Sequence, residues 1–189
     1  MSDTVRTFIA FELPEHIVSA ISQIQEGLKK SGLKMKWVKP ENIHLTLKFL
    51  GNIKTSDVEK VDRAMTQSVK SVDPILLAVK GIGVFPDLRR PRVLWVGITG
   101  SVNSILTLHS AIEENLESIG FPKENRPFKG HLTVGRVKAR IDPKRLTDAM
   151  KVFETFESES FIADHLILFQ SELRPTGAVY TKLKTQSLG

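Results

Sequence analysis

Two kinds of apolar spacing alternate along this chain and predict its secondary structure. Runs rich in β-forming residues predict strands at residues 7–13, 43–50, 75–84, 93–98, 131–137, 161–170 and 179–183. Between these runs, apolar residues recur every three or four positions and predict helices at about residues 17–28, 58–69, 105–119 and 142–150. Ser56 and Glu59 have the spacing of a capping box at the second helix. The pattern therefore predicts an α+β protein.

The predicted elements repeat their order once. Each half reads strand, helix, strand, helix, strand, and a break rich in proline and arginine at residues 86–91 separates the halves. The chain length from Phe8 to His44 agrees within one residue with that from Leu94 to His131. We therefore expect a single domain over residues 1–189, built from repeats at roughly 1–86 and 87–189.

The tripeptide His-Leu-Thr occurs once in each half, at the start of a predicted strand. It occupies residues 44–46 and residues 131–133. Side chains two apart on a strand share a face, so each imidazole should lie beside a threonine hydroxyl, while Leu45 and Leu132 point into the opposite layer. If the two repeats pack about a pseudo-twofold axis, both His-Thr pairs face one small volume.

Two histidines and two threonines around one volume suit the cleavage of a phosphodiester. The reaction needs a base that takes a proton from the attacking oxygen and an acid that protonates the leaving oxygen. Imidazole can serve in either form near neutrality, because its unperturbed pKa is about 6.5. Threonine hydroxyls can donate hydrogen bonds to the non-bridging oxygens as charge develops. A single His-x-Thr is commonly structural, and its repetition in register favours function.

Composition narrows the classes of function. The chain has 27 Lys and Arg against 21 Asp and Glu, a formal charge of +6, which favours an anionic partner. It has no cysteine, which excludes disulfides, cysteine zinc sites and cysteine nucleophiles and fits a cytoplasmic protein. No apolar run reaches the ~20 residues of a membrane helix. Dinucleotide, P-loop and serine-hydrolase motifs are absent, as are histidine pairs with helical metal-binding spacing.

These residues resemble a known family, the two-histidine (2H) phosphoesterases, and within it the RNA 2′,3′-cyclic phosphodiesterases, also named 2′-5′ RNA ligase-like. The resemblance spans nearly the whole chain and is carried by the segments FIAFELP, WVKPENIHLTLKFLG, GIGVFP, RPRVLWVGI, RPFKGHLTVGRVK and SELRPTGAVYTKL. It implies a bilobal fold of two βαβ-type lobes related by a pseudo-twofold axis, with antiparallel sheets around a central cleft. It also implies activity without a metal or an organic cofactor.

The resemblance assigns roles that the residues alone leave open. It makes His44 the proton donor to the leaving ribose oxygen and His131 the proton acceptor that activates water. Thr46 and Thr133 match the positions that orient the phosphate. Arg136 is a further candidate for binding phosphate or RNA, although strand alternation turns it away from His131 unless a bulge at the preceding glycine reverses it.

Other polar and aromatic residues have weaker claims. We expect surface positions for Arg92, Arg174 and Tyr180, although each could rim the cleft. Phe49 and Trp37 could stack on a base, but core packing is the expectation for both. Structural roles are expected for His16, His109 and His165.

The implied function is hydrolysis of an RNA terminal 2′,3′-cyclic phosphate to a 2′-phosphomonoester. The expected partner is an RNA or oligonucleotide with that end, and the expected protein is a cytoplasmic monomer without membrane contact. Two alternatives remain open. One is reversible 2′-5′ RNA ligation by the same site, and the other is a non-catalytic module that binds RNA ends.

Overall fold

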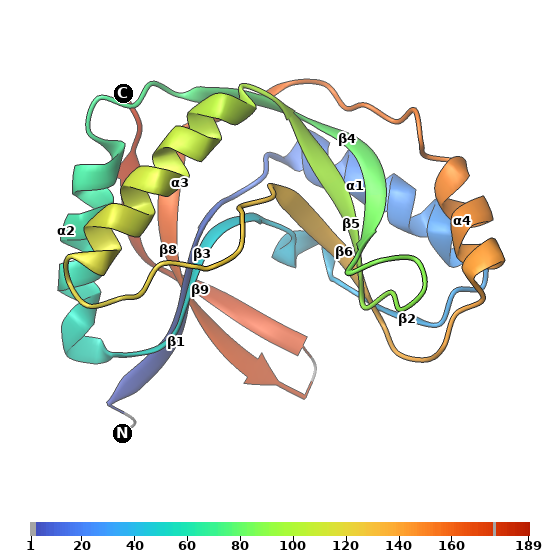
Figure 1. Ribbon diagram of the computed structural model, residues 1–189, viewed down its shortest axis with the longest axis horizontal. Helices are drawn as coiled ribbons and strands as arrows, with labels where there is room; N and C mark the ends of the chain where they lie inside the picture. Colours follow the sequence, from blue (N-terminus) through green and yellow to red (C-terminus); the bar gives the residue numbers. More distant parts are fainter. Residues whose placement is uncertain (1–2, 176) are drawn as a thin grey trace.

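The computed structural model describes residues 3–175 and 177–189 (Figure 1). The first half of the chain forms β1 (Thr4–Phe11), α1 (Glu15–Lys29), β2 (Met35–Trp37), a 3₁₀ turn (Pro40–Asn42), β3 (Leu45–Lys54), a second 3₁₀ turn (Thr55–Asp57), α2 (Val58–Val69) and β4 (Ile75–Phe85). The second half forms β5 (Val93–Gly100), α3 (Val102–Glu117), β6 (His131–Val137), α4 (Pro143–Lys151), β7 (Phe161–Ala163), β8 (His165–Arg174) and β9 (Gly177–Ser187).

The strands form two antiparallel sheets, one in each lobe. Sheet A has the order β3-β1-β8-β9, and sheet B has the order β2-β6-β5-β4-β7. The two halves of the chain exchange strands, because β4 lies beside β5 in sheet B and β8 lies beside β1 in sheet A. The predicted α+β, bilobal architecture with antiparallel sheets is confirmed.

The helices cross between the lobes in the same way as the strands. The Gln25 side chain on α1 donates hydrogen bonds of 2.8 Å to the carbonyls of Val38 and Val134, which ties this helix to sheet B. Helix α3 follows a strand of sheet B but packs with α2 against sheet A (Figure 1). Helices α2 and α3 therefore cover one face of sheet A, α1 packs on sheet B, and the remaining faces are left for the cleft.

One continuous hydrophobic core joins the helices to both sheets. Leu45 and Leu132, the central residues of the two His-Leu-Thr tripeptides, are fully buried in it. This confirms that the leucines point into the layer opposite the histidines. Complete burial of each leucine is worth roughly 1.5–3 kcal/mol, so the core fixes the face that each motif presents.

Both motif strands contain a one-residue bulge at the same place. The register between β3 and β1 leaves Leu47 without a partner, and the register between β6 and β5 leaves Val134 without one. Each is the third residue after a motif histidine. A bulge shifts the alternation by one position, so Phe49 and Arg136 return to the face that carries the histidines.

Two local predictions were wrong, and one short strand was missed. Residues 161–170 form two strands rather than one, because the chain leaves sheet B at Ala163 and enters sheet A at His165. Helix α2 begins at Val58 after a 3₁₀ turn, and its N-cap residue Asp57 makes no side-chain capping bond, so there is no capping box. The short strand β2 was not predicted. No helix in the described part of the chain is long and apolar enough to cross a bilayer.

Candidate active site

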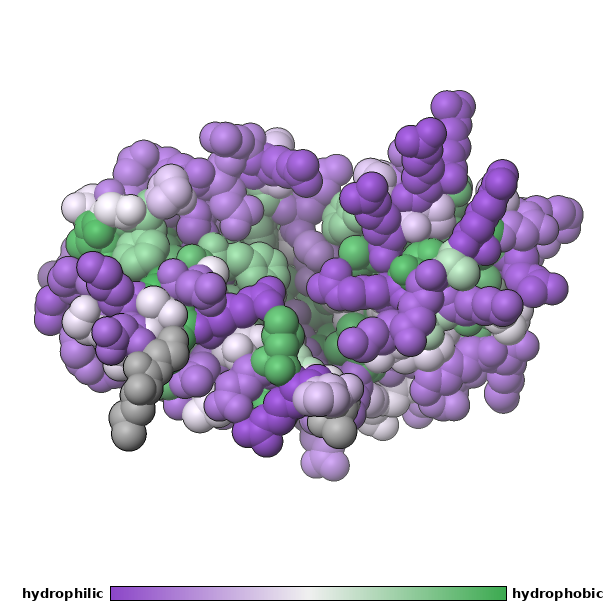
Figure 2. Space-filling model, turned by 90° about the horizontal axis from the view of Figure 1, so that it is seen from below, coloured by the Kyte–Doolittle hydropathy of each residue, from purple (hydrophilic) through white to green (hydrophobic). Residues whose placement is uncertain are grey.

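The two His-Leu-Thr segments meet where sheets A and B adjoin. Cα atoms of β3 and β6 approach within 8 Å, and a Cβ added to Gly130 would lie 3.8 Å from the side chain of Leu45. His44 immediately precedes β3, and His131 is the first residue of β6. In Figure 2, which views the molecule from below Figure 1, a recess separates the two lobes. The residues that precede one motif therefore pack directly against the other motif.

Each histidine ring is held by a backbone carbonyl two residues earlier. Nδ1 of His44 lies 2.8 Å from the carbonyl oxygen of Asn42, and Nδ1 of His131 lies 2.7 Å from that of Lys129. A carbonyl can only accept, so Nδ1 carries the proton in both rings. The Nε2 atoms have no hydrogen-bond partner among the described residues. In the neutral state each Nε2 is therefore a free proton acceptor.

Aromatic side chains pack against both rings. Phe8 stacks on His44 with ring centroids 4.5 Å apart, and Tyr180 meets the same ring edge-on at 5.2 Å. His131 meets the edge of Phe85 at 4.9 Å. The expected surface position of Tyr180 was wrong, because its half-buried ring belongs to the wall behind His44. These contacts leave each imidazole one orientation.

The environment of His44 affects its protonation. Burial lowers the pKa of His44 to about 4, and the hydrogen bond to the Asn42 carbonyl opposes this only in part. The ring is therefore neutral in the free protein at neutral pH. Burial raises the pKa of Tyr180, while the positive charges of Arg136 and Arg6 act in the opposite direction.

Arg136 faces the cleft. Its charge acts on Tyr180, which lies in the opposite lobe against His44, and its side chain is exposed. The bulge at Val134 gives the physical reason, since it reverses the alternation that would have turned Arg136 to the core.

The threonines and Phe49 occupy the same face as the histidines. Thr46 and Thr133 are partly buried, and neither hydroxyl donates a hydrogen bond to another described residue. Phe49 is 62% exposed, and its ring centroid lies 6.1 Å from that of Phe8. The prediction that Phe49 packs in the core was therefore wrong. The cleft face thus combines two imidazoles, two free hydroxyls, one guanidinium and one exposed aromatic ring.

The remaining candidate residues lie away from this group or outside the cleft face. Arg92 and Arg174 are exposed as expected, and Arg174 pairs with Glu172 at 2.8 Å. Trp37 is partly buried against the core, also as expected. The other three histidines make structural contacts or lie on the surface: His16 is exposed, His109 stacks on Phe128 at 4.5 Å, and His165 contacts Asp164 at 2.6 Å.

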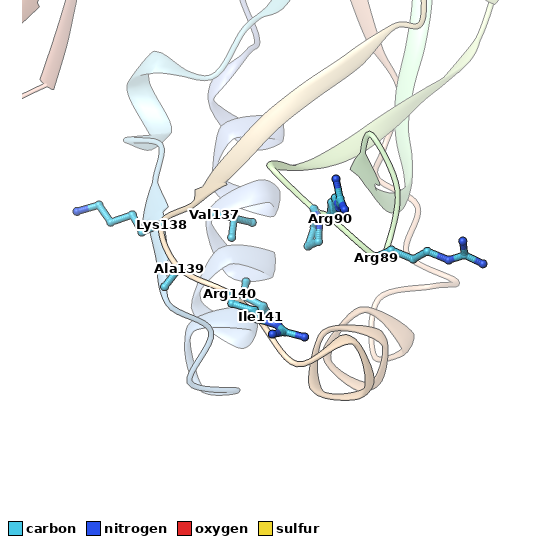
Figure 3. A pocket seen from close by; sticks show the side chains of 8 residues that line it. Arg89, Arg90, Val137, Lys138, Ala139, Arg140 and Ile141 are labelled. Atoms are coloured by element: carbon cyan, nitrogen blue, oxygen red, sulfur yellow. The ribbon is translucent and has the colours of Figure 1, made fainter.

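A separate hollow of about 620 Å³ lies beyond the end of β6 (Figure 3). Arg89 and Arg90 of the β4–β5 loop line one side, and Val137 and Arg140 line the other. Neither motif histidine lines this hollow. Within residues 3–175 and 177–189, no group of three or more His, Asp and Glu side chains is arranged to hold a metal ion.

The sequence is similar to a known family over most of its length. The model of the LigT-like phosphoesterase family matches residues 11–95 and 96–180. A Methanocaldococcus jannaschii protein named RNA 2′,3′-cyclic phosphodiesterase is 36% identical over 95% of this chain and 99% of its own length. An Aquifex aeolicus protein of the same name is 33% identical over 98% of each chain.

Solved structures share the fold. A Thermus thermophilus protein matches with a TM-score of 0.81 and 26% identity, over 97% of both chains. The structure of Escherichia coli LigT complexed with 3′-AMP matches with a TM-score of 0.76 and 23% identity, over 98% of both chains.

Proposed function

Because this chain belongs to the LigT-like phosphoesterase family, we propose that it hydrolyses the 2′,3′-cyclic phosphate at the end of an RNA and leaves a 2′-phosphomonoester. The names of its relatives support this reaction. The observation that carries the proposal is the matched pair of imidazoles. Each ring has Nδ1 occupied by its own backbone and Nε2 free, at two adjoining motif segments.

The proposed reaction moves one proton at each histidine. His131 Nε2 accepts a proton from water, and the water oxygen attacks phosphorus. The bond from phosphorus to the ribose 3′-oxygen breaks, and His44 Nε2 donates a proton to that oxygen. Such proton transfers typically contribute ~10²–10⁴-fold each. The two motif segments lie on opposite lobes, which suits attack and departure on opposite sides of the phosphorus.

The donor role requires that His44 gain a proton when the substrate binds. Burial keeps this ring neutral in the free protein, with a pKa of about 4. A phosphate anion about 4 Å away stabilises the imidazolium by ~4 kcal/mol at an effective dielectric constant near 20. That energy raises the pKa of His44 by roughly three units. It brings the pKa of the bound state close to neutrality, so the substrate itself can turn His44 into an acid.

The remaining cleft residues bind the substrate in this proposal. Thr46 and Thr133 donate hydrogen bonds to the non-bridging oxygens, which gain charge in the transition state. Arg136 adds a permanent positive charge near the phosphate. Phe49 offers an exposed face on which a base can stack, and such stacking is worth ~1–3 kcal/mol. The proposed chemistry uses no metal.

The test compares single histidine variants on a 2′,3′-cyclic nucleotide in the presence of EDTA. His44→Ala and His131→Ala should each lower kcat by ~10²-fold or more. His16→Ala, which removes an exposed histidine from a helix, is the matched control and should retain wild-type turnover. Intact turnover in either motif variant, or loss of wild-type turnover with EDTA, contradicts the proposal.

Product analysis separates the reaction from its alternatives. The wild-type protein should release a product with the phosphate on the 2′-oxygen, assigned by phosphorus NMR. Joining of RNA halves with a free 5′-hydroxyl would indicate the 2′-5′ ligation reaction. Binding of the cyclic end without turnover would indicate an RNA-binding module.

A further inference from the structure

We infer that the RNA chain leading to the cyclic phosphate lies along the β2–β6 edge of sheet B, on a cationic strip formed by Lys34, Lys36, Arg136 and Lys138. This inference rests on the proposed function. It extends that function from the reactive end to the path of the nucleotides that precede it.

The four side chains of the strip lie on one face of the β2–β6 ribbon. Lys36 and Arg136 are direct partners across the two strands, and such partners point to the same face with Cβ atoms ~5 Å apart. The amide of Lys138 donates a 3.3 Å hydrogen bond to the carbonyl of Lys34, which continues the ladder beyond the strands. Alternation places this second pair on the same face as the first.

Neighbouring residues confirm which face this is. Val137, between the two cations of β6, packs toward the core, as do Met35 and Trp37 on β2. Lys138 also borders the hollow that Val137 lines, and in Figure 3 its side chain extends outward on the other side of the strand from Val137. Because Arg136 faces the cleft, the strip begins beside the active site and continues to the edge of the sheet.

The strip carries uncompensated positive charge. Like charges directly opposite each other in a sheet are destabilising, yet none of its four cations has an ion-pair partner among the described residues. Several exposed lysines elsewhere have one, such as Lys80 with Glu157 at 2.9 Å and Lys144 with Asp148 at 2.7 Å, and the strip differs in that four unpaired cations adjoin on one face. A polyanion laid along the strip would replace repulsion with attraction.

Protection of a sheet edge is the competing explanation. Lysines on an edge strand discourage pairing with another sheet, and this accounts for Lys34 and Lys36 on β2. It does not account for Arg136, which stands on the internal strand β6 between β2 and β5. A charge on an internal strand that faces the cleft has no edge to protect.

The dimensions of the strip indicate the length of the substrate. From His131 to Lys138 the strand rises about 20 Å. A mononucleotide whose phosphate lies between the two motif histidines cannot reach the far end of the strip, whereas an oligonucleotide can. The strip therefore predicts preference for an oligonucleotide, and a salt dependence that grows with the number of phosphates bound.

The test measures binding and turnover with two ligands, a 2′,3′-cyclic mononucleotide and an RNA of about 8 nucleotides with the same end. The variant is Lys34→Gln/Lys36→Gln, which leaves Arg136 in place. For the RNA, KM should rise at least about 10-fold at ~50 mM salt, and this rise should shrink several-fold by ~200 mM. The ratio of the two KM values, RNA to mononucleotide, should rise by the same factor.

The matched control is Lys54→Gln/Lys70→Gln, which removes from the other lobe two exposed cations that form no ion pair with any described residue. An equal rise of the KM for RNA in this control would mean that only net charge matters and would contradict the proposed RNA path. The proposed RNA path is also contradicted if the Lys34→Gln/Lys36→Gln variant self-associates more than the wild type but keeps the wild-type ratio of KM values, because the lysines would then only protect the sheet edge. Fluorescence anisotropy with an RNA ending in a 2′-phosphate tests the strip even if no turnover occurs, so failure of the reaction and failure of the strip are distinguishable.

Discussion

Replacing Lys48 with methionine should destabilise the protein strongly, although this residue takes no part in the proposed chemistry. Lys48 is 3% exposed on β3, and its partner Glu113 on α3 is 7% exposed. The ammonium lies 2.7 and 2.9 Å from the two carboxylate oxygens and donates to the Pro122 carbonyl at 2.8 Å. Glu113 also accepts a 2.8 Å hydrogen bond from the Glu124 amide. The pair thus attaches the segment that leads to His131 to the strand that carries the other histidine.

The methionine removes the only lysine that forms an ion pair with the buried Glu113 carboxylate among the described residues, and leaves it with the Glu124 amide and, 3.6 Å away, His109 Nε2. Removal of one partner from a buried ion pair typically costs ~3–5 kcal/mol, a large part of the ~5–15 kcal/mol that stabilises a domain. The control Lys182→Met breaks an exposed pair, whose members are 54% and 47% exposed, and should cost at most ~1 kcal/mol. Urea unfolding followed by circular dichroism gives both free energies of unfolding.

A double variant distinguishes the loss of the ion pair from the loss of side-chain packing. Lys48→Met/Glu113→Gln should cost clearly less than the two single variants together, because each single variant strands the other charge. Below the unfolding transition, the single variants should also lower kcat, since the segment before His131 loses its attachment. If Lys48→Met costs no more than Lys182→Met, the reasoning about this buried pair is refuted.

Three further predictions concern the supports of the site. The pKa of His44 is about 4 in the folded protein and ~6.5 in the unfolded chain. The free energy of unfolding should therefore be unaffected by this group above pH ~6.5 and should fall by about 3 kcal/mol as the pH is lowered to 4. An equal pH dependence of urea unfolding in His44→Gln would contradict this. In Gly83→Ala the new Cβ overlaps the Trp95 ring, so near-ultraviolet circular dichroism should change and stability should fall by ~1–3 kcal/mol; an unchanged spectrum would show that the ring has room. Gln25→Leu removes one donor from the part-buried Val38 carbonyl and one from the Val134 carbonyl, which keeps the Val38 amide at 3.1 Å. The variant should cost ~1–3 kcal/mol in urea unfolding, and a loss below ~1 kcal/mol would mean that water replaces the amide.

Local spacing was sufficient for most elements of the fold but not for their assembly. The strand His131–Val137 was predicted with its observed bounds, because alternation and flanking residues define it locally. The break at Asp164 was missed, since the apolar run 161–170 continues on both sides of it; the polar pair of Asp164 and His165 was the available signal. The exchange of β4 and β8 between sheets depends on contacts between distant segments, which no local pattern encodes.

The face of each motif strand could be predicted only up to its bulge. Strict alternation puts Lys48 beside His44 and Phe49 in the core, and the structure reverses both. The reason is nonlocal, because Lys48 is drawn inward by Glu113 on a helix from the other half of the chain. Tyr180 was misjudged for the same reason, since its contact with His44 depends on the pairing of β9 into sheet A.

The exchange of strands has a consequence for synthesis on the ribosome. Sheet A lacks two of its four strands until β8 and β9 have emerged, and these strands are made after all seven others in the described part of the chain. The wall behind His44 includes Tyr180 of β9, so a nascent chain that has already exposed both histidines still cannot hold the first of them in place. Competence for catalysis is therefore gained only after residues 165–187 have emerged and joined sheet A.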